Sequence, residues 1–210
     1  MKELELFSKI TASATHELKN VFASIKECAG LMEDLLALGE KEGHTYNKRI
    51  KESLHAISDQ VKKGDTVISC LNRFSHTVDS ISNNVDLWDA ISVMIALCQR
   101  MARQRQTTLT LEKKEIPISV SAFPFRVYMV IFMLIQALLE ASLKGSLIKI
   151  TASKSKDHIE VAGTLEKGNM DCIDKTEGFQ SLSEVAGDLG LRITLDLKSS
   201  SLIVVFEGKE

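Results

Sequence analysis

The first 84 residues contain no proline and only four glycines, so very long helices can form there without interruption. Apolar or small residues recur at seven-residue spacing in two series that are offset by three positions. The first series is Leu4, Thr11, Leu18, Ile25 and Met32, and the second is Phe7, Ala14, Val21, Cys28 and Leu35. A stripe sustained over about 30 residues is typical of a helix that packs in a bundle.

A second stripe follows a polar break at residues 39–43. Its apolar members are Ile50, Leu54, Ile57, Val61, Ile68, Leu71 and Val78. Gly64 stands at a seam position of this stripe, where we expect it to weaken or bend the helix. Two long helices joined by a short loop predict an antiparallel hairpin. Because one hairpin cannot bury both stripes, we expect two copies to form a four-helix bundle as a homodimer.

The periodicity changes after residues 82–84, which we interpret as a linker between two domains, 1–84 and 85–210. Helical patterns then cover residues 87–101, 125–143 and 182–189. Short segments typical of strands are 109–112, 118–120, 147–152, 158–162, 191–197 and 202–206. A few helices with mostly hairpin-connected strands predict an α/β two-layer sandwich, so the chain as a whole is α+β.

Composition narrows the function classes. The chain is 44% apolar and 26% charged, an ordinary balance for a globular protein. A net charge of -2 argues against generic binding to nucleic acid or to an anionic membrane. The longest apolar stretch, residues 127–139, is too short to span a bilayer, and the N-terminus has no apolar signal-peptide run. We therefore expect a cytoplasmic protein, whose four widely spaced cysteines are buried apolar residues instead of disulfide or zinc ligands.

One polar group on the first helix suggests chemistry. With Leu18 at the first heptad position, His16 falls on the face turned away from the seam, and Asn20 follows one turn later on the same side. We expect the Glu17 carboxylate to accept a hydrogen bond from one ring nitrogen, which leaves the other as a nucleophile for phosphorus. On these residues alone, a solvated surface pair is the commoner meaning of an exposed histidine beside a glutamate. The remaining histidines, which show no partner pattern, are His44, His55, His76 and His158.

Residues 14–25, which read Ala-Thr-His-Glu-Leu-Lys-Asn-Val-Phe-Ala-Ser-Ile, resemble the phospho-acceptor box of two-component sensor histidine kinases. Asn20 stands where that box has Thr or Asn, and Val21 replaces a frequent proline. The resemblance implies that His16 carries a phosphoryl group and that Glu17 assists its transfer to and from a receiver domain. It also implies that Asn20 positions water for dephosphorylation of the receiver.

The resemblance extends over nearly the whole chain. Residues 85–91 look like the opening of the family's ATP-binding domain, and the basic run 100–105 and residues 123–126 follow in the expected order. The arginines of the basic run either assist docking of an acidic receiver or form a solvated helix face.

The residues that should bind ATP are missing. The family places asparagines for Mg²⁺ on its long helix, but residues 125–143 contain none, and Met133 and Ala137 fall at the corresponding positions. Neither side chain offers an oxygen to a hard cation. Gln136 and Glu140 do offer oxygens, but Gln136 is one residue out of register, so we interpret both as the polar face of the helix.

The glycine motifs are lost as well. After the strand at 158–162, Gly163 and Gly168 have the wrong spacing for the adenine-binding motif, and no Asp accompanies them. The second glycine pair is reduced to Gly178, and the carboxylate of Glu177 beside it would repel a triphosphate. We therefore predict that the chain does not bind ATP tightly.

A hairpin of this family without an ATP site implies a phosphorelay histidine phosphotransferase. It would pass a phosphoryl group between the aspartate of a response-regulator receiver domain and His16, without ATP-dependent autokinase activity. The implied partners are receiver domains and a second copy of the chain. No cofactor is expected, because Mg²⁺ belongs to the receiver. Two alternatives remain open: a receiver phosphatase that works through Glu17 and Asn20, and a non-catalytic pseudo-histidine-kinase that binds receivers.

Overall fold

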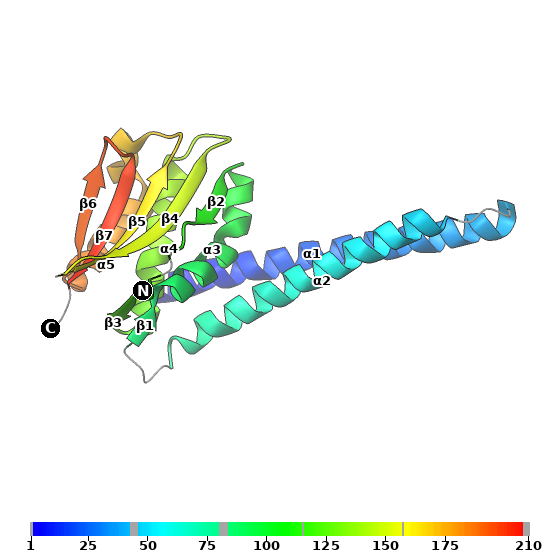
Figure 1. The fold of residues 1–210 in the computed structure, drawn as a ribbon, viewed down its shortest axis with the longest axis horizontal. Coiled ribbons are helices and arrows are strands. Elements are labelled where there is room, and N and C mark those ends of the chain that lie inside the picture. Colours follow the sequence, from blue (N-terminus) through cyan, green and yellow to red (C-terminus); the bar gives the residue numbers. More distant parts are fainter. Residues whose placement is uncertain (1, 43–45, 80–83, 115, 157, 208–210) are drawn as a thin grey trace.

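The computed structural model describes residues 2–42, 46–79, 84–114, 116–156 and 158–207. It consists of a long helical hairpin that projects from an α/β sandwich (Figure 1). This arrangement confirms the fold class predicted from the sequence.

The hairpin is formed by α1 (Lys2–Glu42) and α2 (Asn47–His76), which run antiparallel (Figure 1). Gly64 lies within α2, which continues on both sides of it. It is buried, and a Cβ atom placed on it would lie 3.3 Å from Val21 Cγ1 of α1. The missing side chain therefore lets the two helices approach closely at this level.

The sandwich begins with a small antiparallel sheet of β1 (Asn84–Asp86) and β3 (Ser119–Ser121). The main sheet has the order β2-β4-β5-β7-β6, in which β2 pairs parallel with β4 and the other neighbours are antiparallel. Its strands are β2 (Thr108–Leu111), β4 (Leu147–Lys154), β5 (His158–Leu165), β6 (Arg192–Asp196) and β7 (Ser201–Glu207). The helices are α3 (Leu87–Gln104), α4 (Pro124–Ala141), η1 (Met170–Lys175) and α5 (Glu177–Asp188).

Helix α4 forms the centre of the core. By length and composition it could cross a membrane, but 89% of it is buried inside the protein. Alternate residues of β4 and β5 are buried, as expected for a sheet with one covered face. Gly163 of β5 belongs to this packing, because a Cβ there would lie 2.2 Å from Leu138 Cδ1 of α4. The glycine thus makes room for a core leucine.

The base of the hairpin packs on the sandwich. Phe74 of α2 is fully buried, with ring centroids 5.7 Å from Phe7, 5.8 Å from Phe125 and 6.3 Å from Tyr128. One hydrophobic cluster therefore runs from the hairpin into the core of the sandwich. The division into domains at residue 84 stays a prediction, although Asn84 itself already pairs with Ser121 in the small sheet.

The four cysteines are free thiols. Cys70 and Cys98 are buried as expected, and burial raises the pKa of Cys98 to about 12. Cys28 is half-buried, and Cys172 is exposed on η1, so the expectation of burial was wrong for Cys172. The sequence spacing could not show that η1 turns this residue to solvent.

Candidate functional site

His16 and Asn20 lie on the exposed face of α1, one helical turn apart. His16 has no hydrogen-bond or ion-pair partner among the described residues. Thr15 and Lys19 are exposed beside it. The heptad argument thus predicted the orientation of both side chains correctly, and the imidazole is open to a large partner.

Glu17 is placed differently from its neighbour. Its side chain is 7% exposed and forms ion pairs with Lys63 of α2, at 2.5 Å from Nζ to Oε1, and with Arg103 of α3. Burial by itself would raise the pKa of the Glu17 carboxyl, but the hydrogen bonds and charges of Arg103 and Lys63 outweigh it and hold that pKa below its usual value. The carboxylate is therefore ionised at neutral pH, at the junction of hairpin and sandwich.

This position does not fit the expected hydrogen bond from the His16 ring to Glu17. The Glu17 carboxylate turns instead toward Lys63 and Arg103, which hold it by their charges. Arg103 comes from α3 of the sandwich, far from Glu17 in the sequence, and no sequence pattern connected the two residues. Of the basic run, Arg103 is thus an internal ion-pair partner, whereas Arg105 is exposed at the end of α3.

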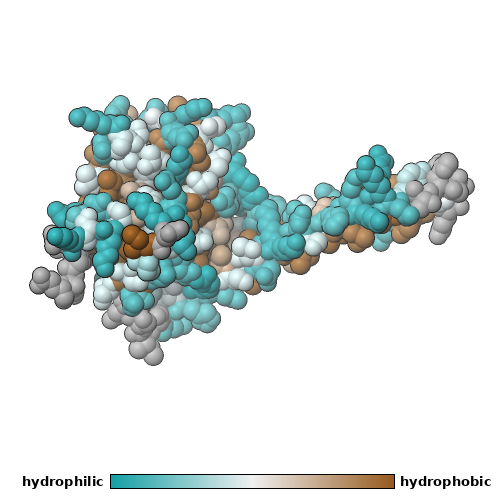
Figure 2. Space-filling model, viewed as in Figure 1, coloured by the Kyte–Doolittle hydropathy of each residue, from teal (hydrophilic) through white to brown (hydrophobic). Residues whose placement is uncertain are grey.

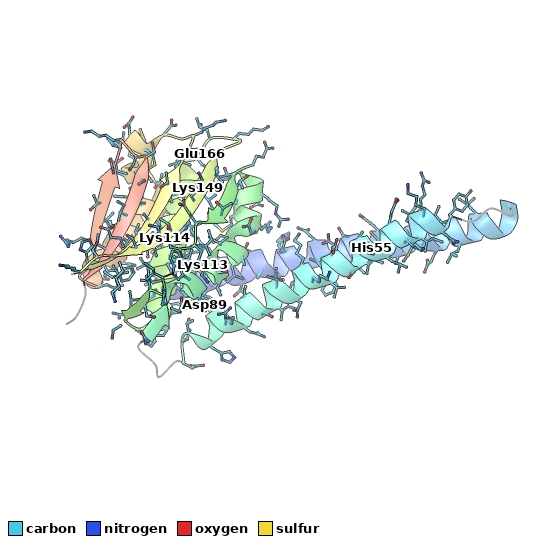
Figure 3. All side chains as sticks on the ribbon, in the orientation of Figure 1. His55, Asp89, Lys113, Lys114, Lys149 and Glu166 are labelled. Carbon is cyan, nitrogen blue, oxygen red and sulfur yellow. The ribbon has the colours of Figure 1, made fainter. Side chains whose placement is uncertain are left out.

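Two further ion pairs join the hairpin to the sandwich. Lys9 of α1 contacts Glu177 at the start of α5, at 3.0 Å from Nζ to Oε1. Arg73 of α2 pairs with Asp89, which lies near the base of the hairpin (Figure 3). The Lys9 pair is on the same face of α1 as His16, two turns earlier, because seven residues make almost two full turns.

The other histidines differ from one another. His55 projects from α2 at a distance from the sandwich and is exposed (Figure 3). His76 is exposed at the end of α2, and His44 lies outside the described residues. His158 has a partner that sequence reasoning missed, because its Nε2 lies 3.0 Å from Glu160 Oε1. Residues two apart in a strand share a face, and that spacing could have indicated the pair.

Ala137 and Gly178, which the resemblance assigns to the ATP site, lie where the second half of α4 meets the start of α5. Here Glu140 accepts a hydrogen bond from the backbone N–H of Gly178 at 2.9 Å and another from Gln136 Nε2 at 2.8 Å. The Thr176 hydroxyl accepts the N–H of Phe179 at 3.2 Å. The N-terminus of α5, which would otherwise attract an anion, is thus capped by the chain's own side chains.

Gly178 brings the start of α5 into direct contact with the backbone of α4. A Cβ on Gly178 would lie 2.5 Å from the backbone N of Ala137 and 2.8 Å from its Cα, so α5 rests directly on the backbone of α4. Helix α5 begins at Glu177, five residues before the predicted start, because Thr176 caps it. The segment around Gly178, which was interpreted as a reduced glycine pair of the ATP site, is therefore the first turn of a helix.

The residues at this position do not fit a magnesium nucleotide. Met133 and Ala137 are buried and offer no oxygen ligand, and the Glu140 carboxylate is already used by Gln136 and Gly178. Within the described residues, no three His, Cys, Asp or Glu side chains gather as metal ligands would.

A cavity of about 980 Å³ lies at the opposite end of α4, bordered by Phe123, Arg126 and Lys154 among others. Its lining includes neither residues of α1 nor any residue from the second half of α4. It is therefore separate from both places discussed above.

No protein-family model and no curated protein matches the chain. Among solved structures, the catalytic domain of histidine kinase ThkA is similar, with a TM-score of 0.50 and 19% identity over 59% of this chain and 93% of that domain. The Acinetobacter baumannii histidine kinase AdeS matches with 15% identity and a TM-score of 0.47, over 87% of this chain and 94% of that one. A bacterial phosphotransferase matches with 14% identity and a TM-score of 0.48, over 96% and 95%.

At these identities the similarity concerns the fold alone, and the ThkA domain has the TM-score of 0.50. In this chain a mixed sheet is accompanied by α3, α4 and α5. The chain therefore shares the fold of histidine kinase catalytic domains, preceded by a long helical hairpin.

Proposed function

We propose that this protein is a phosphorelay histidine phosphotransferase, which passes a phosphoryl group between His16 and the aspartate of response-regulator receiver domains. The observation that carries the proposal is the exposed His16 and Asn20 pair, on a chain in which the residues that the resemblance assigns to ATP pack on one another. In this proposal His16 receives its phosphoryl group from a phosphorylated receiver and not from ATP.

The transfer step requires little of the protein beyond an accessible nucleophile. The lone pair of the unprotonated His16 ring nitrogen attacks phosphorus, and an N–P bond forms as the P–O bond to the receiver aspartate breaks. The electron pair of that bond stays on the aspartate as a carboxylate. The proton on the second ring nitrogen remains there, and the reverse reaction delivers the phosphoryl group to another receiver. The exposure of His16 supports this role, because a receiver must reach the ring directly.

The absence of autokinase activity is supported by the packing around α5. Triphosphate would have to displace Glu140 from the N–H of Gly178, and it would meet a second carboxylate at Glu177. The negative charges of the triphosphate and of these carboxylates would repel one another strongly where water is excluded. Restoring the space would also require α5 to move off the backbone of α4 at Ala137.

The hairpin supports a dimer as the working form. Large apolar side chains are exposed along it, among them Leu4, Phe22, Leu31, Leu36, Leu54, Val61 and Ile68. Figure 2 shows hydrophobic surface along one edge of the projecting hairpin. Exposed apolar side chains along a helical hairpin indicate an interaction surface, and a second copy of the hairpin would cover them in a four-helix bundle.

Phosphoryl transfer from a radiolabelled receiver tests the function. The protein should acquire an acid-labile, base-stable label, and His16→Ala should abolish it. His55→Ala is the matched control, because His55 is also exposed on the hairpin. If His16→Ala keeps the label while the protein remains folded, the phospho-acceptor has been wrongly assigned.

A receiver phosphatase is the second candidate, and the position of Glu17 favours it. With Glu17 bound to Lys63 and Arg103, the exposed groups at this site are His16 and Asn20, and an exposed amide can position water. Asn20→Ala would then slow the decay of receiver phosphate, whereas Asn72→Ala, an exposed asparagine of α2, would not. If no variant affects any receiver, the protein is a binding module without catalysis.

A further inference from the structure

The ion pairs of Glu17 connect the residue next to His16 with the sandwich. Lys63 comes from the partner helix of the hairpin, but Arg103 comes from α3 of the sandwich. Helix α1 is thus held at this point by a side chain of the sandwich.

The three side chains differ in their exposure. The Glu17 side chain is 7% exposed, whereas Lys63 is 39% and Arg103 is 51% exposed. The two cations stabilise Glu17 where it is, because a buried carboxylate without a cation is costly. The cations, however, can be reached from solvent, and an incoming dianionic phosphoryl group would compete with Glu17 for them.

We propose that Lys63 and Arg103 are positioning residues that hold the Glu17 carboxylate away from His16 until a phosphorylated partner draws the two cations to itself. This inference rests on the proposed phosphotransfer at His16 and adds a way in which the transfer is regulated. Once released, Glu17 accepts a hydrogen bond from the ring N–H of His16, and the opposite ring nitrogen keeps its lone pair for phosphorus. The sandwich, through Arg103, then acts as a regulator of the phospho-acceptor instead of as a nucleotide site.

The proposal predicts a gain of activity from the loss of an ion pair. Arg103→Gln should accelerate phosphoryl transfer to His16 about five-fold, the factor that corresponds to roughly 1 kcal/mol for an ion pair with a half-exposed cation. Lys63→Gln should act in the same direction. The double variant Glu17→Gln with Arg103→Gln should show no gain, because the carboxylate that is released is missing. Arg49→Gln, an exposed arginine at the start of α2, is the matched control and should transfer at the wild-type rate.

The dependence of the transfer rate on pH distinguishes this regulation of Glu17 from damage to the fold. In Arg103→Gln one cation that keeps Glu17 ionised is gone, so the gain should disappear as the pH falls through the pKa of the released carboxyl group. Damage to the fold would instead slow transfer at every pH. Circular dichroism checks that each variant is folded, and Lys63→Gln replaces Arg103→Gln if the latter is not.

Phosphoramidate, a small phosphodonor for histidine, makes the test independent of any receiver. Faster labelling of His16 by phosphoramidate in Arg103→Gln, but not in the double variant with Glu17→Gln, supports the restraint of Glu17 by Lys63 and Arg103. If this result is found and no receiver transfers to the wild-type protein, the proposed function is refuted and the restraint of Glu17 is not. If folded Arg103→Gln and Lys63→Gln are labelled at the wild-type rate or more slowly, the proposed restraint of Glu17 is wrong, whether or not receivers transfer to the protein.

Discussion

Substitution of Phe74 by alanine should destabilise the hairpin and the sandwich together. Phe74 belongs to α2, yet it is fully buried and its ring lies within 6.3 Å of Phe7, Phe125 and Tyr128. The cavity left by the ring would therefore open between the two parts of the chain, and not within either one.

The expected loss in the free energy of unfolding is about 3–5 kcal/mol, the usual cost of removing a buried phenylalanine ring. The upper part of that range applies here, since the three neighbouring aromatic rings lose favourable ring contacts as well. Domains of ordinary stability unfold with about 5–15 kcal/mol, so this one change removes a large share of the total.

Urea denaturation followed with two probes measures the effect. Far-ultraviolet circular dichroism is dominated by the long helices, whereas fluorescence reports the single tryptophan, Trp88, which is buried in the sandwich and donates a hydrogen bond to the carbonyl of Ile116 at 2.8 Å. Both midpoints should fall by the same amount, because one hydrophobic cluster joins the two parts. Phe123→Ala, at a residue that is 40% exposed, should cost much less.

A fluorescence midpoint that stays unchanged in Phe74→Ala, while the dichroism midpoint falls, would refute this reasoning. The hairpin would then unfold independently of the sandwich, and the packing at its base would contribute little energy.

Three further predictions follow from the structure. Light scattering should give twice the chain mass of 23.3 kDa, and Phe22→Glu with Val61→Glu, which places charge among the exposed apolar side chains of the hairpin, should give the monomer. Millimolar ATP with Mg²⁺ should leave the melting temperature unchanged, whereas a micromolar site would stabilise the protein by about 4 kcal/mol and raise it by several degrees. Glu17→Gln should lower the free energy of unfolding at neutral pH by about 1–2 kcal/mol, less than for a fully buried pair because both cations are partly exposed. Because the pKa of Glu17 is lowered in the folded protein, its contribution is complete above the ordinary carboxyl pKa and is lost as the pH falls through the lowered value, so wild type and variant should converge in urea titrations in acid.

Much of the fold followed from local patterns. Heptad spacing predicted α1 and α2, and it placed His16 and Asn20 on the exposed face, because helical periodicity alone decides which side chains turn away from a seam. Alternating residues predicted the strands other than β1, whose first residue was interpreted as linker. The absence of asparagine from α4 is the basis of the prediction that the chain does not bind ATP tightly. The start of α5 was placed five residues late, since a glycine and a glutamate after Thr176 resemble a loop until the cap is seen.

The partners of Glu17 and Glu140 could be identified only from the tertiary structure. Glu17 turns toward Lys63 and Arg103, and Glu140 caps α5 at Gly178, and in both cases one partner lies at least 38 positions away in the chain. The parallel pairing of β2 with β4 was equally hidden, because strand patterns carry no information on which neighbour a strand will meet. The sequence by itself determined the longer helices, the strands of the main sheet and the exposed histidine, because these depend on residues a few positions apart. Only packing decided where each buried carboxylate finds its cation or its N–H group, because that choice depends on which distant elements are brought into contact.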